Sequence, residues 1–143
     1  MERSEILLPV TVLVAWSLFM MFWMVAARLP AMRAKGISLR TAVGGRPGVL
    51  DGVIDDRAQW KAHNYIHLME QPTLFYAIAL TLALIGQGDG VNAIIAWVYV
   101  GLRVIHSLIQ ATVNIIRYRF IVFLLSTLAL AALTVHALIA LID

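Results

Sequence analysis

The sequence predicts an all-α membrane protein, a bundle of four transmembrane helices without a soluble domain. Of its 143 residues, 62% are hydrophobic and 13% are charged, whereas about a quarter of the residues in a soluble domain are charged. The hydrophobic residues also form long uncharged blocks, while a soluble core scatters them among charges at helical or strand periodicity. Lipid is therefore the expected solvent, and nucleic acid is not an expected partner.

The first helix is expected at about residues 6–28. Residues 6–27 carry no charge, and about 20 apolar residues suffice to cross the hydrocarbon of a bilayer. A cleaved signal peptide is the alternative, but its apolar region is only about 7 to 15 residues long and follows a basic leader. Glu2, Arg3 and Glu5 make a poor leader. We therefore expect this helix to be retained in the protein.

A loop is expected at residues 29–57, because this segment is rich in glycine and proline, which interrupt helices. The stretch from Arg28 to Arg57 carries six basic residues against three aspartates. Cytoplasmic loops of membrane proteins carry an excess of lysine and arginine. The loop is therefore expected in the cytoplasm, with both termini on the outer side of the membrane.

The second helix is expected at about residues 58–86. Its apolar run, from Pro72 to Gly86, is only about 22 Å long at 1.5 Å per residue, against about 30 Å of hydrocarbon. The polar segment before it must supply the missing turns, which places Glu70 and His67 inside the boundary of the membrane. Helical spacing puts both on one face with His63. Such residues are expected to face protein or water.

The third and fourth helices are expected at about residues 91–116 and 119–142. A lone carboxylate or guanidinium inside the membrane costs several kcal/mol. Since Glu70 and Arg103 lie at similar depths, we predict that Glu70 faces Arg103 or His106 across the packed helices. The polar residues of the third helix fall within about 100° of one another, opposite an aliphatic remainder; they are Arg103, His106, Ser107, Gln110, Asn114 and Arg117.

Several uses of these polar faces are open. Hydrogen bonds between membrane helices contribute about 0.6 to 2 kcal/mol each, so the faces can be purely structural. A metal site is an alternative, because His63, His67 and Glu70 repeat the i, i+4, i+7 spacing of ligands on one helical face. A channel or transporter would need several copies, since the chain shows no inverted repeat.

An anion-binding site at the cytoplasmic end is a further use, because basic residues close three of the expected segments: Arg57, Lys61, Arg117 and Arg119. Positive charge stabilises carboxylates and thiolates. The chain contains no cysteine, so any thiol at such a site has to be brought in by a small molecule.

Two segments stand out: NYIHLMEQPTLFY (residues 64–76) and WVYVGLRVIHSLIQATVNIIRYRFIVF (residues 97–123). They resemble the MAPEG family, the membrane-associated proteins in eicosanoid and glutathione metabolism. The resemblance is strongest to the bacterial members, which carry the pattern NxxNLxExPxLFY. It implies a homotrimer in a bacterial inner membrane, with glutathione bound between neighbouring subunits near the cytoplasmic face. It also implies a lipophilic small-molecule substrate that enters from the surrounding membrane lipids.

The resemblance further implies roles for single residues. Glu70 matches the family's carboxylate that contacts glutathione, and Arg103 and His106 match an RxxH pair on the third helix. Arg119 lies at about the position of the arginine that stabilises the glutathione thiolate, which makes it the expected catalytic residue. The other residues expected to bind glutathione are Arg57, Lys61, Asn64, His67, Gln110 and Arg117.

Several positions depart from the family pattern. His67 stands where the family usually has asparagine, Gln110 where several glutathione-using members have tyrosine, and Phe120 where some relatives have a hydroxyl. Lys61 sits near a position where they carry an arginine. Two functions are therefore open. One is a glutathione-dependent transferase or peroxidase that acts on lipophilic electrophiles, and the other is a non-catalytic protein of the same fold whose polar interior is structural or binds a small anion.

Overall fold

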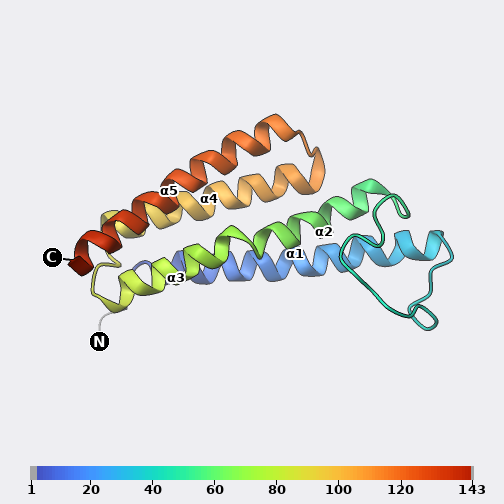
Figure 1. Ribbon diagram of the computed structural model, residues 1–143, viewed down its shortest axis with the longest axis horizontal. Helices are drawn as coiled ribbons and strands as arrows, with labels where there is room; N and C mark the ends of the chain where they lie inside the picture. Colours follow the sequence, from blue (N-terminus) through green and yellow to red (C-terminus); the bar gives the residue numbers. More distant parts are fainter. Residues whose placement is uncertain (1–2, 143) are drawn as a thin grey trace.

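The computed structural model describes residues 3–142, and all the regular secondary structure in this range is α-helical. Its helices are α1 (Leu7–Ala34), α2 (Asp56–Leu68), α3 (Gln71–Leu84), α4 (Val91–Thr112) and α5 (Ile116–Ile142). Helices α2 and α3 run almost end to end, so the chain forms an elongated bundle of four rods (Figure 1). The predicted all-α class is confirmed for the described residues.

Three helices in the described range, α1, α4 and α5, are long and apolar enough to cross a membrane. Helix α3 has 14 residues and is about 21 Å long, so it spans about 30 Å of hydrocarbon only together with part of α2. The loop between α1 and α2 lies at the same end of the bundle as the turn between α4 and α5 (Figure 1). The start of α1 and the end of α5 lie at the opposite end, beside the connection from α3 to α4.

Helix α1 continues to Ala34, beyond the expected end at residue 28, and passes through Pro30. A proline inside a helix removes one hydrogen bond, and here it falls near the helix end, where few bonds remain to be lost. The last turn of α1 packs on a small buried cluster formed by Leu50, Ile54 and Ala58. This contact explains why α1 continues past residue 28. The loop consequently occupies residues 35–55, not 29–57.

The second helix, expected to be continuous over residues 58–86, is interrupted at Met69 and Glu70. Pro72 explains the interruption, because proline has no N–H to donate and its ring clashes with the carbonyl four residues earlier. The N–H of Glu70 instead donates to the His67 carbonyl at 3.3 Å. The side chain of Thr73 donates to the Glu70 carbonyl at 2.7 Å. Helix α3 therefore starts anew at this point, with its own orientation of side chains.

The main hydrophobic core lies between the rods and takes residues from all of the long helices. Leu13 and Met20 come from α1, Phe75 from α3, Tyr99 from α4 and Leu133 from α5. The rings of Phe75 and Tyr99 stack with centroids 4.4 Å apart and planes inclined by 17°. This stacked pair fixes α3 against α4 just beyond the interruption, next to the polar group described below.

Candidate functional site

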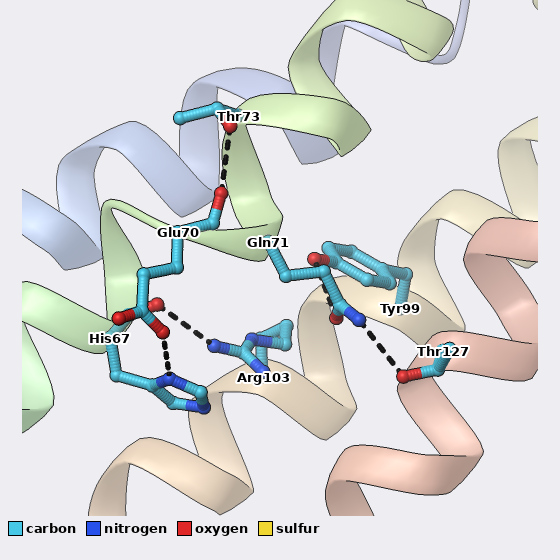
Figure 2. A network of polar contacts seen from close by, with 7 residues as sticks. All are labelled: His67, Glu70, Gln71, Thr73, Tyr99, Arg103 and Thr127. Carbon is cyan, nitrogen blue, oxygen red and sulfur yellow. Dashed lines mark hydrogen bonds and ion pairs between the residues drawn. The ribbon is translucent and has the colours of Figure 1, made fainter.

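Polar side chains gather where α2 ends against α4 (Figure 2). The ring of His67 bonds the Glu70 carboxylate with 2.7 Å between Nδ1 and Oε2. The fully buried Arg103 of α4 donates from Nη2 to the His67 carbonyl at 3.4 Å. The last carbonyls of a helix carry partial negative charge, which a cation stabilises. Arg103 therefore caps the C-terminus of α2 from the neighbouring helix.

The predicted pairing of Glu70 with Arg103 or His106 is not formed. Within residues 3–142 the carboxylate of Glu70 pairs with His67 of its own turn, and 62% of its side-chain surface is exposed. The contact with His67 explains this outcome. Met69 still has a helical backbone conformation, so Glu70 lies three residues from His67 on the same face and its carboxylate bonds that ring.

Two histidine rings and one phenylalanine ring, from three helices, meet beside Arg103. His106 of α4 is 2% exposed, and its ring centroid lies 4.8 Å from that of His67. The ring of Phe123 of α5 lies 5.7 Å from His67 and 6.3 Å from His106. Nδ1 of His106 has no hydrogen-bond partner among the described residues. The imidazoles of α2 and α4 and the start of α5 thus form one compact group.

The polar stripe of α4 continues along its buried face. The side chain of Asn64, on α2, donates a hydrogen bond to the hydroxyl of Ser107, and both residues are fully buried. One turn later Gln110 is also buried, and no described residue bonds its side-chain oxygen. Asn114 and Arg117 lie beyond the end of α4 and do not belong to this buried face. The stripe is therefore shorter than the spacing predicts.

The structure contains a further polar network that the spacing of residues did not predict. Tyr99 donates to Oε1 of Gln71 at 3.3 Å, and Gln71 donates to the hydroxyl of Thr127 at 2.9 Å (Figure 2). Tyr99 precedes Arg103 by one turn on the same face, so extending the stripe by a turn would have found it. The sequence does not indicate the contact of Thr127 with Gln71, because a threonine in a membrane helix commonly bonds its own backbone.

Arg119 is positioned by the turn between α4 and α5. Asn114 adopts a left-handed conformation with a φ of 51°, which asparagine tolerates better than most residues, and it ends α4 before the expected residue 116. Its side-chain oxygen accepts a hydrogen bond from Nη1 of Arg119 at 2.7 Å. Arg119 is half-buried, and its Nε is buried without a partner in the described chain.

A model of the MAPEG family matches residues 6–139, nearly the whole chain. The chain belongs to the MAPEG family. The family predicted from the two motif segments is thus confirmed, and with it an integral membrane protein. Members of this family are glutathione-related transferases or peroxidases. No curated protein and no solved structure matches the chain.

The other basic residues of this MAPEG protein take separate partners. Lys61 donates to the carbonyl of Arg57 at 2.7 Å and lies over the ring of Trp23, 5.6 Å from its centroid. Arg117 is exposed and lies against the ring of Tyr118 at 5.4 Å. In the described range no hydrogen bond or ion pair joins Arg57, Lys61 or Arg117 to Arg119. Within a single chain, therefore, Arg57, Lys61 and Arg117 make no direct polar contact with Arg119 among the described residues.

The MAPEG chain has a second polar cluster, where the loop meets α2. Oδ1 of Asp51 lies 2.8 Å from Nε2 of His63 and accepts a hydrogen bond of 2.6 Å from the Gln59 side chain. The bond with His63, followed by that with Gln59, lowers the pKa of the Asp51 carboxyl below its ordinary value. His63 shares a helical face with His67, yet it contacts Asp51 of the loop and not the group around Arg103.

Proposed function

We propose that this MAPEG protein is a glutathione-dependent transferase or peroxidase that acts on lipophilic electrophiles. The observation that carries the proposal is Arg119, a half-buried guanidinium that Asn114 holds in place and whose Nε has no partner in the described chain. A neighbouring cation lowers the pKa of a thiol and so favours the thiolate. Because the chain contains no cysteine, the thiol has to come from a bound small molecule.

The residues present suit glutathione, which offers a thiol, an ammonium group and two carboxylates. When bound, glutathione supplies the thiolate that attacks an electrophile. Arg119 holds negative charge at the sulfur, and the exposed carboxylate of Glu70, oriented by His67, accepts hydrogen bonds from the ammonium group. Lys61 and Arg57 would pair with the two carboxylates of glutathione. Arg103 acts indirectly, since it fixes the end of α2 and thereby the place of Glu70.

The proposal extends to the way the chain sits in the membrane. The combined length of α2 and α3 supports four crossings. The excess of basic residues in the loop supports a cytoplasmic location for the loop, with both termini outside. The resemblance to bacterial members of the family supports a bacterial inner membrane. Large apolar side chains on α1, α4 and α5 are exposed in the single chain. They offer surface both to lipid and to neighbouring subunits of a homotrimer. Native mass spectrometry in detergent would then show three copies, whereas a single copy would contradict the trimer.

Ultraviolet difference absorbance of the thiolate tests the function directly. Glutathione is titrated into the detergent-purified protein and into the variants Arg119→Ala and Glu70→Gln. The control is Arg33→Ala, which removes an exposed arginine of α1. We expect a saturable thiolate signal in the wild type and the control, no signal in Arg119→Ala, and weaker binding in Glu70→Gln.

A non-catalytic role is the alternative, and one observation favours it. Nε and Nη1 of Arg103 are buried without partners among the described residues, and such donors suit a small anion in a protein interior. No thiolate signal at millimolar glutathione would support this role and reject the enzyme. A thiolate signal that persists in Arg119→Ala would keep the enzyme but reject Arg119 as its catalytic residue.

A further inference from the structure

A cavity of about 870 Å³ lies between the end of α1, the loop of residues 35–55 and α2. Its volume falls in the range of about 300 to 1,000 Å³ that small-molecule sites occupy. Much of its wall is apolar, with contributions from Met24, Val25, Leu29, Met32, Val49 and Ile66. Neither the polar group around Arg103 nor Arg119 lines it. The cavity is therefore separate from the site proposed for glutathione.

Positive charge at this cavity is only partly balanced by the protein. Arg28 and Arg46 line it, and Asp51 is the one acidic residue of its lining. The Asp51 carboxylate already bonds His63 and Gln59. Nε of Arg28 is buried without a partner in the described chain, and its Nη1 has only the sulfur of Met24, at 4.0 Å. An apolar wall beside unpaired guanidinium groups complements an amphiphile with an anionic head.

The position of the cavity indicates where such an amphiphile comes from. Arg28 is the first charged residue after the uncharged stretch of residues 6–27, so it lies at the level where α1 leaves the hydrocarbon. The loop side chains that line the cavity include Leu39 and Val43, which are 68% and 96% exposed. We propose that the cavity binds an anionic phospholipid of the adjoining leaflet, with the phosphate at Arg28 and Arg46 and an acyl chain along the apolar wall.

Native mass spectrometry of the detergent-purified, delipidated protein tests this site. Phosphatidylglycerol and phosphatidylcholine with the same acyl chains are titrated, each alone and in the presence of glycerol phosphate. A basic residue near a membrane surface contributes about 1 kcal/mol to binding of anionic lipid. We therefore expect phosphatidylglycerol to bind more tightly than phosphatidylcholine, and Arg28→Gln to weaken its binding about fivefold. Glycerol phosphate should not compete, since it lacks the acyl chain.

The matched control is Arg33→Gln, which removes the same charge from the same helix but outside the cavity. It should leave binding unchanged. The neutral substitution Ala42→Trp, at an exposed position of the lining, should fill part of the cavity and weaken binding, and it tests the site even if Arg28→Gln does not fold. Equal binding of both lipids, equal effects of Arg28→Gln and Arg33→Gln, or competition by glycerol phosphate would each overturn the proposal.

Discussion

Helices α4 and α5 are both long and apolar enough to cross a membrane, yet they bury different kinds of side chain. The buried face of α4 includes Arg103, His106, Ser107 and Gln110. The buried residues of α5 are Ser126, Leu130, Leu133 and Ala137. Hydropathy identifies both helices as membrane spans, but it does not show on which face their polar residues lie. The spacing of the few polar residues shows which helix carries the polar interior and which supplies mainly apolar packing.

Arg103→Ala is the change for which we expect the largest effect. Arg103 is fully buried and donates to the His67 carbonyl, and removing one partner of a buried hydrogen bond costs about 1 to 3 kcal/mol. Leu128→Ala on α5 is the matched truncation, because Leu128 is 59% exposed in the chain. Unfolding in a denaturing detergent series measures both free energies. Equal losses in the two variants would contradict the distinction between α4 and α5.

The bond between Asn64 and Ser107 is the next test. A double-mutant cycle of Asn64→Ala with Ser107→Ala should give a coupling free energy of about 0.6 to 1.7 kcal/mol, the range for polar contacts between membrane helices. Asn64→Ala combined with Ser126→Ala is the control cycle, because the hydroxyl of Ser126 bonds the carbonyl of Phe123 in its own helix. A coupling as large in the control would show that the cycle reports general loosening of the bundle.

Two threonines of α5 sharpen the comparison within one helix. Both hydroxyls donate to a carbonyl four residues earlier in α5, but only that of Thr127 also accepts a hydrogen bond from Gln71 of α3. Thr127→Val should lower the free energy of unfolding by about 0.6 kcal/mol, and Thr134→Val should change it less. The same detergent series measures both variants, and a larger loss in Thr134→Val would reject the role of the contact between α3 and α5.

The exposed contact of Asp51 with His63 should matter least to the fold and should respond to pH. The folded protein lowers the pKa of Asp51 from its ordinary value of 3.8. The contact is therefore fully present above that value and is lost as pH falls through the lowered pKa. A nitroxide label at Thr41→Cys, the only cysteine in that variant, should report a loop that is ordered at pH 7 and mobile in strong acid.

Asp51→Ala provides the control for this experiment. The labelled loop should be mobile at pH 7 already, because the carboxylate that accepts both hydrogen bonds is absent. An ordered loop in Asp51→Ala, or the same pH dependence in both proteins, would show that another group holds the loop on α2.

The sequence predicted the buried face of α4 because a helix of regular period places Arg103, His106 and Gln110 on one side, and all three are buried. It failed for the partner of Glu70, because regular spacing places this carboxylate beside His67 but does not decide which neighbouring group it bonds. The end of α4 was also missed, since it depends on the left-handed conformation of Asn114. Periodicity predicts which residues share a face of a helix, but it predicts neither where the helix ends nor which contacts form on that face.

The roles in glutathione binding were predicted in a different way from the buried face of α4. They came from a resemblance of residues, and the family is now established for nearly the whole chain, while the roles of Arg119 and Glu70 stay predictions. The cluster of Asp51, Gln59 and His63 could not be foreseen, because a loop aspartate has no period that would assign it to a helix. Contacts between a loop and a helix depend on the path of the loop.

The cap that Arg103 places on α2 also bears on how the chain is made. Synthesis proceeds from the N-terminus, so α2 and α3 leave the ribosome before α4. The carbonyl of His67, to which Arg103 donates, is therefore already present when the guanidinium reaches the membrane. A charge that would be costly in lipid alone enters beside its acceptor. Helix order thus eases the insertion of α4, and a chain permuted to begin with α4 would have to insert Arg103 unaccompanied.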